Sequence, residues 1–282
     1  MITRREFFPA IAGGLGVTST TLRNLNPLHL VFHAKGSYDP RFDSPFQAIL
    51  NATVRIKRYT YLEDGNAIIG IGTGFVYKET KDGYFICTNY HVVRNHERVG
   101  IVDEKVSILL EDNTLIPVEV VKANSKLDIA VLISSQSELE EKVLPTNYPY
   151  LQWGNADLKK DDKLLIVGYQ DGAILEVNIG YVVIPEKEDN ENGYDHKDVW
   201  FLSTGKRGNS GASVLKEVKH PQFGVVYEFV GIFHSTKIWS PIDPEATTLE
   251  DNIVQTLRRE KQEDAIHRSR AVLYSEFQSM LS

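Results

Sequence analysis

The chain has 282 residues, of which 42% are hydrophobic and 24% are charged. This composition is that of a globular protein with a sizeable core, and it excludes the fibrous and largely disordered classes. The net charge of −7 argues against a nucleic-acid partner, because nucleic-acid-binding proteins usually present a basic surface. The single cysteine, Cys87, excludes an intramolecular disulfide, and its apolar neighbours predict a buried side chain rather than a reactive thiol.

The first 44 residues are predicted to form an export signal and a linker or arm. Thr3-Arg4-Arg5-Glu6-Phe7 precedes a weakly apolar, glycine-bearing stretch, and this pattern resembles a bacterial twin-arginine signal. The expected location is therefore periplasmic or otherwise extracytoplasmic. A basic terminus without signal function, in a cytoplasmic protein, is the alternative. The apolar stretch is too short to span a bilayer, and no integral membrane span is predicted elsewhere.

Short strand-like runs dominate residues 45–240, and they fall into two sets on either side of Leu144-Pro145. The runs are 54–61, 67–77, 83–89, 106–110, 117–121 and 129–133, then 163–168, 175–183, 199–203, 212–215 and 225–233. Many short strands at regular spacing are typical of sandwiches and barrels. The pattern predicts an all-β protein of two packed six-stranded antiparallel barrels, at about residues 45–140 and 146–240.

Two segments depart from this strand pattern. Residues 186–198 are acidic and rich in Asn, and they are predicted to form a surface loop. Residues 241–282 are predicted to form a helical C-terminal extension, because Leu273, Phe277, Met280 and Leu281 recur at helical spacing.

A serine nucleophile would suit the run Gly208-Asn209-Ser210-Gly211. A serine hydroxyl attacks well only when a base removes its proton and nearby donors stabilise the oxyanion. The glycines allow a tight turn, so the N–H groups of Gly208 and Ser210 can point at one spot and form an oxyanion hole. Taken alone, the run is equally compatible with an ordinary surface turn.

His91 and Asp128 complete a candidate catalytic triad. His91 follows the strand-like run 83–89, where a rigid strand end can orient a general base. Asp128 directly precedes the apolar run 129–133, and a carboxylate buried there needs a partner such as an imidazole N–H. Taken alone, a histidine at such a strand end is more often structural than catalytic, and the aspartate is equally compatible with an exposed turn. The order His, Asp, Ser is that of chymotrypsin-type peptidases, with His91 and Asp128 in the first strand set and Ser210 in the second.

Five runs of the sequence resemble the HtrA/Deg branch of the trypsin-like serine peptidases. They are Gly72-Thr73-Gly74-Phe75, residues 82–93, residues 127–132, residues 178–183 and residues 208–211, and the resemblance covers roughly residues 50–236. It implies a bacterial serine endopeptidase that cleaves polypeptides through an acyl-enzyme. Ser210 would be the nucleophile, His91 the base and Asp128 the orienting acid. No cofactor is implied, and the scattered histidines show no zinc-ligand spacing, so no metal is expected.

The same resemblance implies a substrate pocket walled by Thr204, Phe233, His234 and Ser235. No acidic residue lies near the pocket base, so a small or medium apolar side chain is expected rather than Lys or Arg. The chain departs from the family at Ala212, where the family has a second glycine after the serine. Only about 45 residues follow the resemblance, so a PDZ domain is not expected.

Two alternatives to a constitutive peptidase remain open. One is a degenerate peptidase fold that binds polypeptides without cleaving them, as Ala212 would suggest. The other is a latent peptidase gated by its helical tail or by a partner. The tail is also the candidate contact for a homo-oligomer or a regulatory partner.

Overall fold

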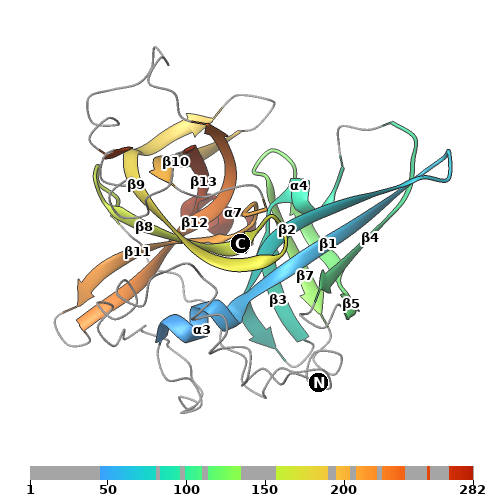
Figure 1. Ribbon diagram of the computed structural model, residues 1–282, viewed down its shortest axis with the longest axis horizontal. Helices are drawn as coiled ribbons and strands as arrows, with labels where there is room; N and C mark the ends of the chain where they lie inside the picture. The colour runs from blue at the N-terminus through green and yellow to red at the C-terminus, as the bar shows by residue number, and fades with distance from the viewer. Residues whose placement is uncertain are drawn as a thin grey trace.

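The computed structural model describes residues 45–80, 83–95, 99–109, 114–134, 157–189, 195–203, 208–220, 224–238, 253–254 and 267–281. These residues form two antiparallel strand assemblies with short helices, as Figure 1 shows. The predicted all-β, two-barrel class is therefore confirmed. The predicted export signal and arm at 1–44 lie outside the described residues.

The first assembly is a curved seven-stranded sheet with the strand order β5-β4-β1-β2-β3-β7-β6. Its strands are β1 (Thr53–Leu62), β2 (Ala67–Thr80), β3 (Gly83–Thr88), β4 (Ile101–Leu109), β5 (Leu115–Pro117), β6 (Glu119–Asn124) and β7 (Ile129–Ser134). The run predicted at 117–121 is divided between β5 and β6, because Pro117 has no N–H to continue a ladder. The described pairings leave β5 and β6 at opposite ends, so this assembly is a half-barrel rather than a closed one.

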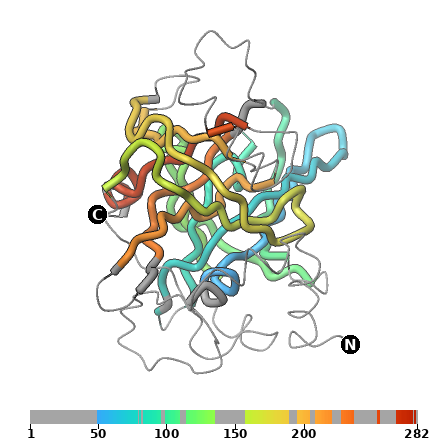
Figure 2. Tube along the Cα trace, turned by 60° about the vertical axis from the view of Figure 1, so that its left-hand side comes forward, coloured from blue at the N-terminus to red at the C-terminus, as the bar shows by residue number. Residues whose placement is uncertain are grey.

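A helix that the sequence analysis did not predict leads into this sheet. It is α3 (Pro45–Ala52), and proline suits the first position of a helix because its missing N–H is not needed there. At its end, the Thr53 hydroxyl donates to Ile49 O at 2.9 Å. Beyond α3, β1 and β2 form a long hairpin whose tip projects from the molecule in two views (Figures 1 and 2).

The second assembly is a closed barrel with the strand order β10-β13-β12-β11-β8-β9. Its strands are β8 (Lys163–Gln170), β9 (Ile174–Asp189), β10 (His196–Ser203), β11 (Ser213–His220), β12 (Gly224–Ile238) and β13 (His267–Leu273). One hydrophobic cluster contains buried residues of both assemblies, including Phe75 of β2 and Phe229 of β12, whose ring centroids are 5.1 Å apart. The two assemblies thus share a core.

Of the predicted helical extension, the described residues 253–254 and 274–281 are helical, whereas residues 267–273 are not. Residues 267–273 form β13, which pairs with both β10 and β12 and closes the barrel. Ala271 and Val272 of this strand are fully buried, and the helical spacing begins only at Leu273, the last residue of β13. The helix α7 (Tyr274–Leu281) follows, with Phe277 buried edge-on against Tyr77 at 5.3 Å between centroids.

The loop predicted at 186–198 is wrong at both of its ends, and its middle, residues 190–194, lies outside the described residues. Residues up to Asp189 continue β9, and β10 begins at His196. The acidic side chains are accommodated because they face cations across the ladder; Glu186, for example, bonds to Lys197 Nζ at 2.7 Å.

Cys87 is fully buried in β3, as its apolar neighbours predicted. Burial raises the pKa of its thiol well above the usual value, so it is a packing residue. Among the described residues, no helix is long and apolar enough to cross a membrane.

Candidate active site

His91 lies on α4 (Tyr90–Val93), a single helical turn that directly follows β3. The turn is fixed from β1, because Arg58 donates from Nη1 to His91 O at 2.7 Å. Arg58 is itself paired with the mostly buried Glu104, at 3.7 Å from Nε to Oε1. This arrangement holds the His91 backbone at the end of the sheet, as predicted for a base on a rigid strand end.

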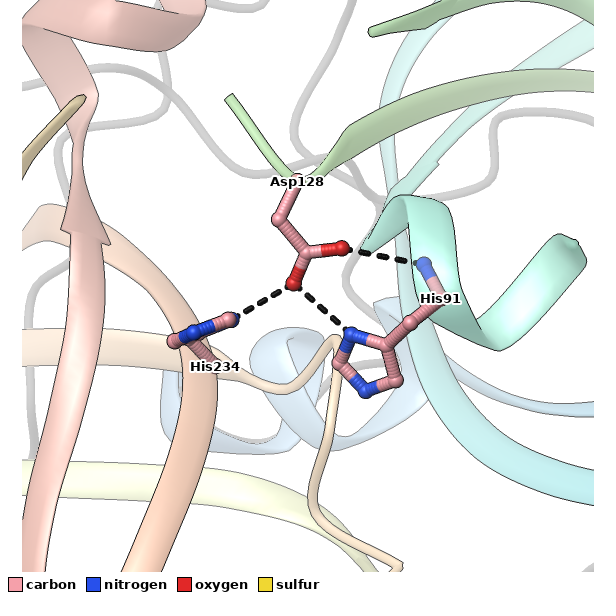
Figure 3. A group of neighbouring side chains, drawn as sticks. All are labelled: His91, Asp128 and His234. Carbon is pink, nitrogen blue, oxygen red and sulfur yellow. Dashed lines mark hydrogen bonds and ion pairs between the residues drawn. The ribbon is translucent and has the colours of Figure 1, made fainter. Parts of the chain in front are cut away.

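The side chain of His91 bonds to Asp128, as Figure 3 shows. His91 Nδ1 lies 2.7 Å from Asp128 Oδ2, and the His91 backbone N–H donates to Asp128 Oδ1 at 2.9 Å. An ionised carboxylate can only accept, so Nδ1 carries the proton and Nε2 is left as the basic nitrogen. The His91 side chain is 30% exposed, whereas that of Asp128 is fully buried. The predicted pair is therefore brought together with the geometry of a base and its orienting acid.

Asp128 occupies a backbone conformation that few residues other than glycine adopt. Its φ is +50°, and the side chain of Asn89 holds it there by donating from Nδ2 to Asp128 O at 2.9 Å. Asn89 is fully buried and was not singled out as a functional residue. A polar side chain at the end of the apolar run 83–88 was the signal that could have identified it.

The charge of Asp128 is retained despite its burial. Burial alone would raise the pKa of this carboxyl, but His91 and His234 outweigh that cost and hold the pKa below its usual value. Asp128 is therefore ionised at neutral pH.

The turn around Ser210 is tied to both strand assemblies. Thr73 of β2 donates its N–H to Ser210 O at 2.8 Å and its hydroxyl to Gly208 O at 3.0 Å. On the other side, Gly211 donates its N–H to Phe233 O of β12 at 2.9 Å. Gly208 has a φ of +94°, which supports the tight glycine turn expected from the sequence. Thr73 had no predicted role, because its partners lie far away in the sequence.

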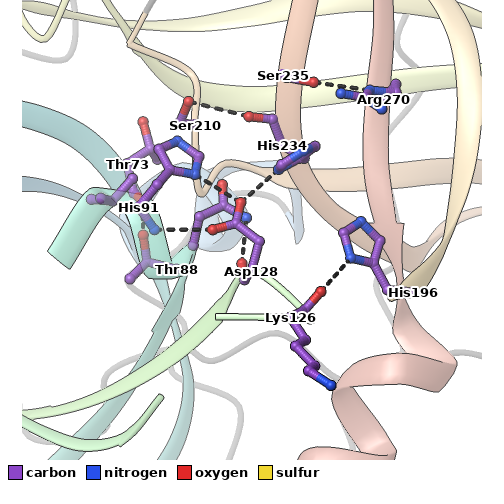
Figure 4. A network of polar contacts seen from close by, with 12 residues as sticks. Thr73, Thr88, His91, Lys126, Asp128, His196, Ser210, His234, Ser235 and Arg270 are labelled. Atoms are coloured by element: carbon purple, nitrogen blue, oxygen red, sulfur yellow. Dashed lines mark hydrogen bonds and ion pairs between the residues drawn. The ribbon is translucent and has the colours of Figure 1, made fainter. Parts of the chain in front are cut away.

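Ser210 and His91 both lie beside His234. The Ser210 hydroxyl donates to His234 O at 3.4 Å (Figure 4). The ring centroids of His91 and His234 are 5.9 Å apart. The structure thus brings the three predicted triad residues to one place between the assemblies.

Of the predicted pocket residues, His234 is placed differently from the others. Its side chain is buried against Asp128, with Nδ1 2.5 Å from Asp128 Oδ2. Phe233 is also buried, and Ser235 accepts a bond from Arg270 Nε at 3.0 Å. Thr204 lies outside the described residues.

Ala212 fits beside the nucleophile without a conformation reserved for glycine, since it is not among the described residues with positive φ. A Cβ placed on Gly168 of β8 would lie 2.6 Å from the Ala212 methyl, so Gly168 leaves the room that the methyl fills. The departure from the family pattern is thus compensated within the second barrel.

His91, Asp128 and His234 offer three ligand atoms close enough to surround a metal ion. Two of the separations, 2.7 and 2.5 Å, are hydrogen-bond distances. Ligands on a tetrahedral zinc with bonds near 2.0 Å lie about 3.3 Å apart. The group is therefore arranged as donors around a carboxylate.

Comparisons with known proteins agree with this geometry. A family model described as a trypsin-like peptidase domain matches residues 72–220. Two curated relatives, from Rickettsia prowazekii and Rickettsia conorii, are each named probable periplasmic serine endoprotease DegP-like. Each is 26% identical over 179 residues, which is 62% of this chain. The chain spans less than a third of the length of these relatives.

Solved structures show the same fold. The active form of the Rv3671c protease from M. tuberculosis matches with a TM-score of 0.51 at 15% identity, covering 92% of this chain and 90% of that one. An HtrA-type protease, AlgW, with a tripeptide matches with a TM-score of 0.50 at 16% identity, covering 82% and 59%. The solved structures show the fold, and the two DegP-like relatives agree with the resemblance to the HtrA/Deg branch. Since the family model covers more than half of the chain, the chain belongs to the trypsin-like peptidase family.

Proposed function

We propose that the protein is a serine endopeptidase that cleaves polypeptides through an acyl-enzyme, with Ser210, His91 and Asp128 as its triad. The observation that carries the proposal is the bond from His91 Nδ1 to the buried, ionised Asp128. This bond fixes the tautomer that leaves His91 Nε2 free to accept a proton.

The reaction follows from that tautomer. The Ser210 hydroxyl turns from His234 O toward His91 Nε2, which takes its proton as Oγ attacks the peptide carbonyl carbon. His91 then gives this proton to the leaving amine, and the acyl group stays on Ser210 Oγ until water attacks it by the reverse sequence. Asp128 stabilises the imidazolium that exists between the two transfers.

The oxyanion of the tetrahedral intermediate would be bound by the N–H groups of Gly208 and Ser210. Each such donor is worth about 3 kcal/mol in the transition state. The positive φ of Gly208 and the bonds from Thr73 support a turn that is already shaped for this purpose.

Thr204, Phe233, Ser235 and the backbone of His234 remain the proposed surroundings of the substrate side chain, with an apolar side chain preferred; the ring of His234 is turned toward Asp128 instead. The names of the curated relatives support an extracytoplasmic site of action. We also propose that the N-terminal segment containing Arg4 and Arg5 acts as a twin-arginine export signal.

A fluorophosphonate probe followed by mass spectrometry tests the nucleophile. We expect labelling at Ser210 and digestion of denatured protein by the wild type. Ser210→Ala should abolish both, and Asp128→Asn should slow both by about 10⁴-fold, because the tautomer of His91 is lost. Ser275→Ala, on the exposed side of α7, should leave both unchanged.

Folded wild-type protein that is neither labelled nor able to digest denatured polypeptides would contradict the proposal. It would favour the non-cleaving, polypeptide-binding alternative instead.

A further inference from the structure

His234 stands at an irregularity of β12 that turns its side chain toward the site. Phe233 pairs with Ala271 of β13 and Ser235 pairs with Arg270, so His234 is the extra residue of a β-bulge. A bulge re-aims a side chain that a regular ladder would direct elsewhere. His234 consequently has no partner residue in the register of β12 and β13, and its ring is directed to Asp128 (Figure 3).

Asp128 accepts three hydrogen bonds through its two carboxylate oxygens. Oδ1 takes the backbone N–H of His91, and Oδ2 takes both His91 Nδ1 and His234 Nδ1. Since the carboxylate only accepts, the proton of His234 lies on Nδ1. The two imidazoles therefore share one oxygen, and each limits how the other can bind it.

We propose that His234 is a positioning residue of the triad: its Nδ1–H is a second imidazole donor that fixes Asp128 and moderates the pull of the carboxylate on His91. The inference deepens the proposed peptidase function and rests on it. His234 touches neither substrate nor the reacting atoms through its ring; it acts through Asp128. Its backbone, in contrast, adjoins the Ser210 hydroxyl.

The surroundings of His234 explain why its orientation is stable. From β10, the His196 ring packs edge-on at 5.6 Å between centroids. His196 Nδ1 lies 3.0 Å from Lys126 O, so it must donate (Figure 4). Its Nε2 faces Asp198 Oδ1 at 3.1 Å. Within the described part of the chain, the charged and titratable groups around His234 are thus Asp128 before β7, His91 on α4, and His196 with Asp198 on β10. Arg270 of β13 bonds to the neighbouring Ser235.

The hydrogen bond from His234 to Asp128 has a predictable effect on His91. A hydrogen bond to a carboxylate lowers its effective charge toward other partners. Without the His234 donor, Asp128 would attract the protonated His91 more strongly and would be free to turn. The acidic limb of the kcat/KM profile should then move to higher pH, and kcat should fall while KM changes little.

Asparagine and leucine at position 234 make a matched pair of variants. They have nearly the same size and both branch at Cγ, but only Asn places an N–H donor where His234 has Nδ1. We expect His234→Leu to lower kcat by about 10- to 100-fold, the worth of a hydrogen bond to a charged group, and to shift the acidic limb upward. His234→Asn should stay close to wild type in both respects.

Equal losses in the Leu and Asn variants, or unchanged kcat and pH profile in folded His234→Leu, would overturn the proposal. Should His234→Leu fail to fold, ¹⁵N spectra of wild-type histidines decide: a proton on Nε2 alone of His234 at neutral pH is incompatible with the inference. These spectra need no turnover, so they separate this inference from a failure of the peptidase proposal itself.

Discussion

Some residues of this site matter as much for the backbone conformation that they adopt as for the chemistry of their side chains. Asp128 adopts a positive φ held by Asn89, and Gly208 adopts one held by Thr73. A Cβ on Gly208 would lie 2.6 Å from Tyr169 O and 2.7 Å from Asp171 N, both backbone atoms that cannot move cheaply. The nucleophile turn thus requires a residue without a Cβ atom at position 208.

Gly208→Ala should therefore lower kcat by about 10²- to 10³-fold, the cost of displacing one oxyanion donor. The measurement is hydrolysis of a peptide substrate by protein that is shown to be folded. Gly65→Ala at the hairpin tip is the matched control, since Gly65 also has a positive φ, of +81°, but no atom lies near its Cβ position. We expect it to cost about 1 kcal/mol of stability and no activity. Full activity of Gly208→Ala would contradict this account of the turn.

The predictability of the site from sequence differs between residues. His91, Asp128 and Ser210 could be named because each stands beside a strand-like run and their order is informative. Thr73, Asn89 and the side chain of His234 could not, because their bonds join residues far apart in the chain, such as Thr73 and Gly208, which are 135 positions apart. No local pattern records such a contact.

At the scale of elements, the pairing of each segment with its neighbouring strands determines whether it forms a strand and where its side chains point. Most strands were predictable from alternating or continuous apolar runs. β13 was not, because the helical spacing that begins at Leu273 gives no sign that the residues before it fill the place between β10 and β12. The bulge that aims His234 also depends on the register against β13 and leaves no mark on the sequence.

The contact between β8 and the nucleophile turn allows a test by compensation. Gly168→Ala should destabilise the protein, because the new methyl would lie 2.6 Å from the methyl of Ala212 and close to Thr73 Oγ1. We expect a loss of about 1–3 kcal/mol in chemical denaturation. Ala212→Gly should recover part of this loss in the double variant. Independent, additive effects of the two substitutions would contradict the proposed contact.

At the scale of the whole molecule, the tail is part of the fold rather than an appendage. β13 closes the second barrel, and α7 buries Phe277 against Tyr77 of the first assembly. Release of the whole tail would therefore open the barrel, which is a poor design for a reversible gate. This argues against the form of latency in which residues 241–282 act as a detachable helix.

Removal of all residues after Pro244 should accordingly abolish cooperative thermal unfolding, because β10 and β12 lose their shared partner and the buried Ala271 and Val272 are lost. Calorimetry or circular dichroism would show the loss. A peptide of residues 260–282 added to the truncated chain should restore part of the transition. Wild-type unfolding of the truncated chain alone would show that β13 is dispensable.

The late position of β13 also bears on how the protein is made. A ribosome adds about 5–20 residues per second, so roughly 3–13 seconds separate the synthesis of Ser210 from that of Leu273. During that interval the nascent chain contains every triad residue, but β10 and β12 lack the strand that lies between them. The His234 bulge has no register until β13 pairs with β12. The site is therefore complete only after β13 has been synthesised, so the nascent chain carries all three triad residues for some seconds without an assembled active site.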